Sequence, residues 1–224
     1  MSSISIIGVG NMARALASRA LASGNAVEII GRDLSKAKAL AAALGGATVG
    51  TAGTAPAGDI VVLAVPYASA AAVISQYGDA LNRKVIVDIT NPITADFTGF
   101  LTPEGSSGAQ EIAKAAPAGT HVVKAFNTLP CDVLAVGSID GRPVDVFIAG
   151  DDAQAKARVS AFIDSLGMHP MDAGAAAHGA GTGERHPAAT RPHHPLRQES
   201  ESVPRRQCPQ LSAPPPLLAP IPSF

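Results

Sequence analysis

Short runs rich in Ile and Val alternate along the first 174 residues with longer stretches that carry small apolar residues at helical spacing. Alternation of strands and helices is typical of right-handed βαβ units. The pattern therefore predicts an α/β fold with a doubly wound parallel sheet. The predicted strands are 3–7, 26–30, 47–49, 60–65, 84–88, 121–125, 144–148 and 168–171, and the predicted helices are 11–23, 34–44, 67–77, 108–115 and 153–166.

The periodic pattern ends near residue 174. Residues 175–224 contain ten prolines, five arginines, four histidines and no lysine. Such a composition builds no core, so we predict one folded domain over residues 1–174 and a disordered Pro-rich tail over residues 175–224. Two origins of the tail stay open. It is either a genuine partner-binding segment or a frameshifted translation, and the abrupt loss of lysine favours the frameshift.

Composition limits the kinds of partner. The net charge is −1 and no block of like charge occurs, which argues against nucleic acid as a partner. No run reaches the roughly 18 apolar residues of a membrane helix, and the N-terminus does not resemble a signal peptide. The two cysteines, Cys131 and Cys208, fit no metal or redox spacing. We therefore predict a cytoplasmic protein with a small-molecule partner and no bound metal.

A glycine-rich turn follows the first predicted strand. Residues 8–13 have the spacing Gly-x-Gly-x-x-Ala between a strand and a helix. Gly8 permits the tight turn, Gly10 lets a diphosphate approach the backbone, and Ala13 lets the helix pack closely on the sheet. The free N–H groups of the following helix attract phosphate. A Rossmann-type dinucleotide site is predicted, with the pyrophosphate held by Gly8, Val9, Gly10, Asn11 and Met12.

The end of the second predicted strand distinguishes NADP from NAD. An NAD site usually carries an acidic residue there, whereas this chain has Gly31 followed by Arg32. A small residue leaves room for a 2′-phosphate, which a guanidinium can bind in a bidentate way. Lys36, one helical turn on, would add a second positive charge. These residues predict NADP(H), the alternative being an Arg32 that is merely exposed next to Asp33.

Two further strand ends are expected at the ligand crevice, because ligands bind outside the carboxyl ends of the strands in doubly wound sheets. Ala64, Val65 and Pro66 follow the fourth strand, and Asn91 follows the fifth. We expect these four residues close to the nicotinamide half of the cofactor. The alternative is that they form ordinary turns at the ends of strands.

Four segments together resemble the NADPH-dependent F420 reductases, over about residues 3–174. They are Val87–Pro92, Val122–Pro130, Phe147–Asp152 and Met171–Gly174. The resemblance implies hydride transfer between NADP(H) and the deazaflavin coenzyme F420 as co-substrate, without a catalytic side chain, since the cofactors carry the chemistry. It also implies that the nicotinamide and the deazaflavin stack at the loop formed by Asn127, Thr128, Leu129, Pro130 and Cys131.

The chain departs from that family in two places. The F420 reductases usually have His where this chain has Asn127, and Asn there matches the cytosolic reductase domain of the six-transmembrane ferric reductases. The family also continues after Asp-Ala-Gly with long helices that complete the acceptor pocket and a dimer interface, which the tail here does not resemble. One alternative is therefore a non-enzymatic NADPH sensor or an acceptor-deficient enzyme. A ferric or flavin reductase is a second alternative, and a homodimer is left open.

Two other dehydrogenase classes would begin with a similar glycine-rich turn. These are the β-hydroxyacid dehydrogenases and the pyrroline-carboxylate reductases. Both need a large helical C-terminal domain, which fifty Pro-rich residues cannot supply.

Overall fold

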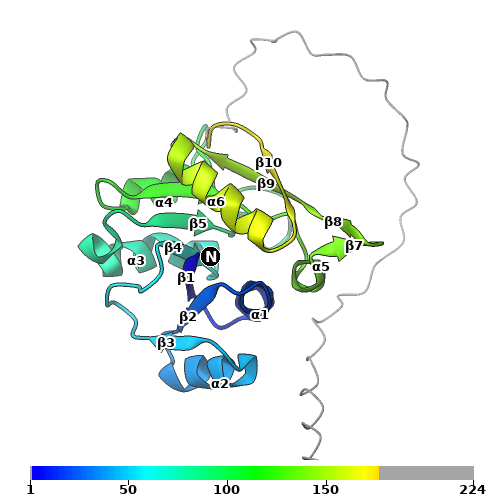
Figure 1. Cartoon of the computed structure of the whole chain (residues 1–224). Helices are drawn as coiled ribbons and strands as arrows, with labels where there is room; N and C mark the ends of the chain where they lie inside the picture. Colours follow the sequence, from blue (N-terminus) through cyan, green and yellow to red (C-terminus); the bar gives the residue numbers. More distant parts are fainter. Residues whose placement is uncertain (1, 177–224) are drawn as a thin grey trace, which may run out of the picture.

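The computed structural model describes residues 2–176, which form an eight-stranded sheet with helices on both faces (Figure 1). Across the sheet the strand order is β10-β9-β6-β5-β4-β1-β2-β3. The predicted tail lies outside the described residues from residue 177 onward, so its boundary at residue 174 stays a prediction. The strands are β1 (Ser3–Ile7), β2 (Ala26–Ile30), β3 (Thr48–Gly50), β4 (Ile60–Leu63), β5 (Val85–Asp88), β6 (His121–Lys124), β9 (Asp145–Gly150) and β10 (His169–Asp172).

The helices begin and end close to the predicted positions, and polar side chains cap three of them. Asp33 accepts hydrogen bonds from two backbone N–H groups at the start of α2, Ser107 forms a capping box with Gln110 at α4, and Asp152 caps α6. The helices are α1 (Asn11–Ala22), α2 (Leu34–Leu44), α3 (Tyr67–Tyr77), α4 (Gly108–Ala115), α5 (Cys131–Val136) and α6 (Ala153–Ser165), with a 3-10 turn, η1 (Gly78–Leu81).

The sheet is mostly parallel, as predicted, but it is not parallel throughout. Strands β1 to β6 pair in parallel, whereas β9 pairs with β6 in the antiparallel sense, with Lys124 opposite Ala149. The connection between them contains only the short helix α5 and the small hairpin of β7 (Ser138–Ile139) and β8 (Arg142–Pro143). These elements do not carry the chain back to the end of the sheet at which β6 begins. Strand β9 therefore begins at the end of the sheet where β6 finishes, and it runs in the opposite direction.

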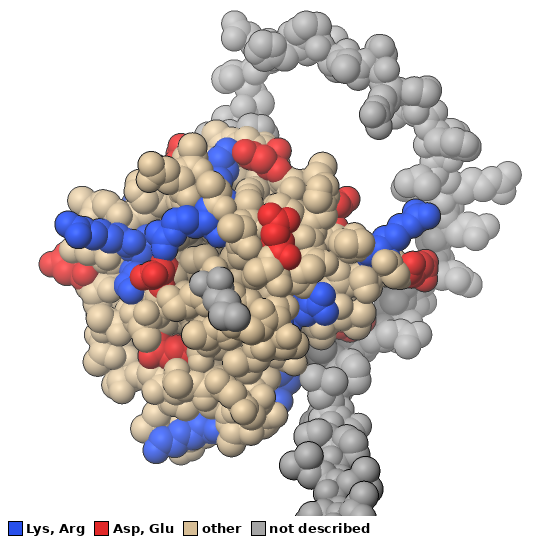
Figure 2. Space-filling model, in the orientation of Figure 1, with Lys and Arg blue, Asp and Glu red and all other residues tan. Residues whose placement is uncertain are grey.

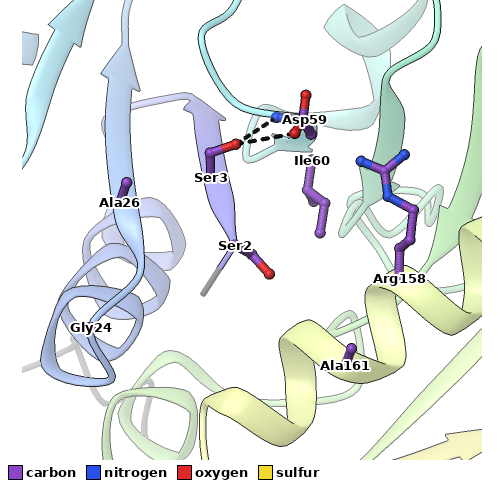
Figure 3. A pocket seen from close by; sticks show the side chains of 8 residues that line it. All are labelled: Ser2, Ser3, Gly24, Ala26, Asp59, Ile60, Arg158 and Ala161. Atoms are coloured by element: carbon purple, nitrogen blue, oxygen red, sulfur yellow. Dashed lines mark hydrogen bonds between the residues drawn. The ribbon is translucent and has the colours of Figure 1, made fainter.

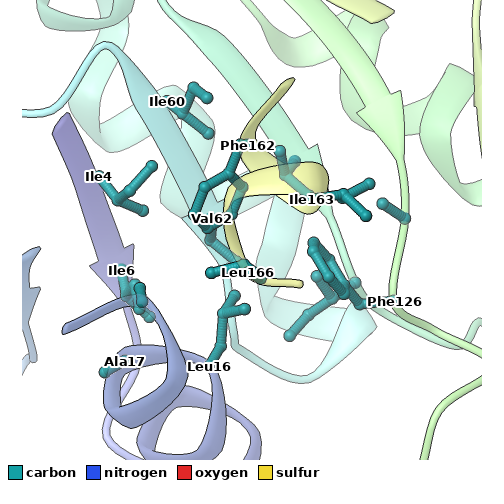
Figure 4. Packing of buried hydrophobic residues seen from close by; sticks show 14 of the residues in the cluster. Ile4, Ile6, Leu16, Ala17, Ile60, Val62, Phe126, Phe162, Ile163 and Leu166 are labelled. Atoms are coloured by element: carbon teal, nitrogen blue, oxygen red, sulfur yellow. The ribbon is translucent and has the colours of Figure 1, made fainter. Parts of the chain in front are cut away.

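Two apolar clusters lie on the two faces of the sheet. The larger cluster joins the sheet to α1, α2, α5 and α6, and the smaller one joins it to α3, η1 and α4. Every residue of β4 and β5 is buried, as expected for central strands covered on both faces. In the larger cluster, Phe126 meets Phe162 of α6 edge-to-face at 6.3 Å between ring centroids (Figure 4).

Charged side chains of both signs are interspersed on the face shown in Figure 2, with no broad patch of a single sign there. This agrees with the net charge of −1. Among the described helices, none is both long and apolar enough to cross a membrane.

A buried polar contact joins the first two strands to the loop before β4. The hydroxyl of Ser5, which is fully buried, donates to the carboxylate of Glu28 and accepts a 2.8 Å hydrogen bond from the backbone N–H of Gly58. A Cβ atom on Gly58 would lie 2.4 Å from the Ser5 backbone nitrogen. The loop therefore approaches β1 too closely for a side chain, and the Ser5 hydroxyl satisfies its N–H.

We predict that Ser5→Ala destabilises the domain, because it leaves the buried N–H of Gly58 without its partner. The free energy of unfolding should fall by about 1–3 kcal/mol, measured by urea denaturation. Ser35→Ala, which changes an exposed serine in the first turn of α2, is the matched control and should leave the unfolding midpoint nearly unchanged. Equal midpoints for the two variants would contradict the prediction.

Candidate functional site

The loops that follow β1, β4 and β5 meet at the carboxyl edge of the sheet, around a cavity of about 470 Å³. This is where a doubly wound sheet places its ligand. The cavity is also lined by Tyr67 and Thr90. Seven of the predicted site residues line it: Gly10, Asn11, Met12, Ala64, Val65, Pro66 and Asn91.

The two glycines of the turn after β1 have different roles. Gly8 has φ +138°, and a Cβ atom there would lie 2.1 Å from the carbonyl oxygen of Ala64. Its N–H donates to the carbonyl of Ile30 at 2.8 Å. Gly8 is therefore required by the protein itself. Gly10, in contrast, is exposed in an ordinary extended conformation, and a Cβ atom there would meet no protein atom within 4 Å.

The start of α1 can attract an anion. Gly10 occupies the cap position and offers no side chain to the first turn, which contains no acidic residue. The first N–H groups of a helix have no partner within it and carry a partial positive charge. The space beside Gly10 therefore suits a phosphate bound by backbone N–H groups.

The end of β2 presents a free cation. Arg32 is exposed and makes no hydrogen bond or ion pair within residues 2–176. Asp33 is held by capping α2, because its Oδ1 accepts from the N–H groups of Ser35 and Lys36 at 2.9 and 3.1 Å. The Nζ of Lys36 lies 3.9 Å from the other carboxylate oxygen of Asp33, with both side chains at least half exposed. An ion pair that exposed is weak and leaves Lys36 available.

Gly31 was predicted to be small in order to admit a phosphate, and the structure gives another reason. Gly31 is buried, and a Cβ atom there would lie 2.9 Å from Cγ1 of Val9 and 3.4 Å from Cβ of Ala37. Its small size is therefore already required by packing between the glycine-rich turn and α2.

The loops after β5 and β6 are joined to each other by two asparagines. Nδ2 of Asn91 donates to the carbonyl of Asn127 at 3.0 Å, and Nδ2 of Asn127 donates to Oδ1 of Asn91 at 3.3 Å. A second cavity, of about 720 Å³, lies next to the first one and shares Asn91 and Ile93 with it. Lys124 and Asn127 line this second cavity.

Phe126 fixes the beginning of the loop after β6. It has φ +60°, which is rare for a residue with a large side chain, while its ring is fully buried. Conformations of this kind concentrate at functional sites, where the surrounding packing holds them. The buried ring of Phe126, which contacts Phe162, therefore anchors the backbone directly before Asn127.

Four other predicted residues of this loop lie away from both cavities. Leu129 and Cys131 pack against the larger core cluster, and Pro130 occupies the cap position of α5. Thr128 is exposed and lines neither cavity. Of the five residues expected at the ring-stacking loop, the structure brings only Asn127 to a cavity.

Tyr67 and Lys124 line the cavities, and the sequence analysis named neither of them as a site residue. Tyr67 begins α3, and Thr90 follows β5. Partial burial, with the negative charges of Glu111 and Asp88 nearby, raises the pKa of the Tyr67 phenol, so it stays protonated at neutral pH. Lys124 belongs to a segment that the sequence analysis quoted as a motif, and that was the available signal.

A third cavity, of about 450 Å³, lies at the amino ends of β1, β2 and β4 (Figure 3). Ser3 and Asp59 bond to each other there, with Asp59 N donating to Ser3 Oγ at 3.2 Å. Arg158 of α6 extends beside it (Figure 3). None of the predicted site residues lies at this edge.

Comparison with known proteins gives one family. Residues 3–92 match the model of the family described as NADP oxidoreductase, coenzyme F420-dependent. The chain is 31% identical over 174 residues to metalloreductase STEAP3 of Rattus norvegicus. The aligned region makes up 78% of this chain and 34% of that relative. The chain thus spans about a third of the length of that relative.

Several solved structures are similar to this chain. A hypothetical protein of Sinorhizobium meliloti is 32% identical with a TM-score of 0.70, over 80% of this chain and 88% of that one. A candidate F420-dependent NADP reductase of Arthrobacter sp. FB24 is 25% identical with a TM-score of 0.70, over 79% of this chain and 86% of that one. The pyrroline-5-carboxylate reductase of Coxiella burnetii, at 19% identity and a TM-score of 0.54 over 76% of this chain and 58% of that one, shares the fold alone.

We predict that alanine at the two glycines has opposite consequences. Gly10→Ala should leave the unfolding midpoint unchanged and weaken NADP binding roughly tenfold or more, equivalent to about 1.4 kcal/mol, because the methyl group enters only the ligand space. Gly8→Ala should lower the free energy of unfolding by about 1–3 kcal/mol, because it strains the backbone against Ala64. Calorimetric binding and urea denaturation of both variants measure the two effects. A Gly10→Ala protein that binds NADP like the wild type would contradict the assignment of this space to the pyrophosphate.

Proposed function

Because the chain belongs to the family described as NADP oxidoreductase, coenzyme F420-dependent, we propose that it transfers a hydride between NADP(H) and a deazaflavin of the F420 type or a related flavin. The observation that carries this proposal is the pair of adjacent cavities at the carboxyl edge of the sheet, which share Asn91 and Ile93. The first cavity suits the nicotinamide half of the dinucleotide. The second cavity has room for another ring system beside it.

The residues of the first cavity, together with two cations near the end of β2 that lie outside its lining, fit NADP(H). The uncrowded Gly10 and the free N–H groups of α1 can accept the pyrophosphate, and the exposed Arg32 and Lys36 can bind the 2′-phosphate. Ala64, Val65 and Pro66 form an apolar wall against which a nicotinamide ring could pack. When bound, NADPH supplies the hydride from its nicotinamide ring. The protein contributes position and water exclusion, since no nucleophilic side chain is required.

A ferric or flavin reductase is the second candidate function. Its support is Asn127, which matches the ferric-reductase version of the loop, together with the likeness to a metalloreductase. A non-enzymatic NADPH sensor is the remaining alternative. The small-molecule acceptor is the partner that we propose, and a homodimer and a cytoplasmic location stay predictions.

Arg32→Ala should distinguish the two dinucleotides. The variant should lose roughly 10- to 100-fold in affinity for NADPH, since a charge-assisted hydrogen bond to the 2′-phosphate is removed, while its affinity for NADH changes little. Titration of both dinucleotides by fluorescence measures this. Lys38→Ala is the matched control, because Lys38 is an exposed cation on α2, two residues beyond Lys36 and therefore on a different face of that helix. Equal losses for NADPH and NADH would contradict the proposed role of Arg32.

The acceptor is identified by turnover. The purified protein is mixed with NADPH and, separately, with F420, FMN or a ferric chelate, and the loss of absorbance of each acceptor is followed. We expect reduction of F420 or FMN. Reduction of the ferric chelate in the absence of any flavin would favour the second candidate, and NADPH binding without turnover of any acceptor would favour the sensor.

A further inference from the structure

An ion pair connects the ends of β5 and β6 behind the second cavity. The Nζ of Lys124 lies 2.9 Å from Oδ2 of Asp88, and the two residues are register partners in the sheet. The Asp88 side chain is fully buried, whereas that of Lys124 is 20% exposed. Lys124 also donates to the carbonyl oxygen of Thr90, whose N–H donates to Oδ1 of Asp88 at 2.8 Å. Both carboxylate oxygens are therefore satisfied, and the ammonium is held in place.

The ammonium of Lys124 has a hydrogen-bond donor to spare. A lysine carries three N–H donors, and Asp88 and Thr90 accept two of them. Lys124 lines the second cavity, where the other charged lining residue among those described is Glu104, which is exposed. The remaining donor can thus reach a ligand in that cavity.

Thr90, whose carbonyl oxygen accepts from Lys124, also has a buried hydroxyl next to the first cavity. Its residue is 4% exposed and lines the first cavity, and within residues 2–176 its Oγ1 has no hydrogen-bond partner. Buried hydroxyl groups are nearly always paired in folded proteins. The Thr90 hydroxyl, next to the carbonyl that Lys124 contacts, therefore has hydrogen-bonding ability that no described residue satisfies.

We propose that Lys124 contacts the electron acceptor and favours acceptors whose ring carries a conjugated carbonyl oxygen. This inference rests on the proposed function. When a hydride moves from the nicotinamide to a flavin or deazaflavin ring, NADPH becomes NADP⁺ and the acceptor gains two electrons and a negative charge, which spreads onto a ring nitrogen and the adjacent carbonyl oxygen. The third N–H of Lys124 donates to that oxygen and stabilises the charge. Lys124 keeps its proton, and solvent supplies the one that neutralises the ring.

The obvious variant needs a compensating change. Lys124→Met alone would leave the buried carboxylate of Asp88 without its cation, which is costly. The double variant Asp88→Asn/Lys124→Met removes both charges, and Asp88→Asn alone keeps the lysine donor. Lys84→Met is the matched control, since Lys84 is 18% exposed and pairs with Asp59 at 3.7 Å at the opposite edge of the sheet.

The test compares acceptor and dinucleotide in the same proteins. Relative to Asp88→Asn, the double variant should show a roughly 10- to 100-fold lower kcat/KM for FMN or F420, while its Kd for NADPH and its unfolding midpoint change little. Bound reduced FMN should stay anionic to lower pH in the wild type than in the double variant, as read from its absorbance spectrum. Lys84→Met should behave as the wild type in every measurement.

Three results would overturn the inference. The first is a kcat/KM in the double variant equal to that of Asp88→Asn. The second is a loss of NADPH affinity as large as the loss of kcat/KM for the acceptor. The third is a protonation pH of bound reduced FMN that is the same in the wild type and the double variant. A failure of the proposed function looks different, because the wild type itself would then reduce no acceptor with NADPH.

Discussion

The close approach of the Gly8 turn to strand β4 is the constraint on which the rest of the site depends. The backbone of Gly8 lies against the carbonyl of Ala64, too near for any side chain, and its N–H bonds to the end of β2. One residue thus brings three strand ends together. Because the chain turns there, α1 begins beside the cavity with its free N–H groups at the edge where Ala64, Val65 and Pro66 also lie.

The other half of the site is held by contacts between side chains rather than by backbone proximity. Asn91 and Asn127 bond to each other across the loops, and Asp88 and Lys124 pair just below them. Phe126 fixes the beginning of its loop by burying its ring in the core. The wall between the two cavities is therefore polar and internally hydrogen-bonded, and it places the charge of Lys124 next to the second cavity. The first cavity, in contrast, is lined at β4 by small apolar residues.

Most of the fold could be predicted because the signals are local. The alternation of apolar runs located the main strands, and caps such as Asp33 placed the helix ends within a few residues. Strand β4 ends at Leu63, two residues earlier than its apolar run, because periodicity does not show where the pairing stops. Helix α5 and the hairpin of β7 and β8 were not predicted, since they are too short to develop a period.

The sequence by itself determined the doubly wound α/β fold, the glycine-rich turn and the cation at the end of β2, since each depends on residues a few positions apart. Tertiary structure decided what depends on distant partners. It made β9 antiparallel, and it gave Gly31 a packing role against Val9. The four residues from Thr128 to Cys131 lie outside the linings of both cavities. Lys124 lies beside Asp88, which is 36 residues earlier in the chain. No local pattern contains such information, because the energy of a buried contact depends on which segments the fold brings together.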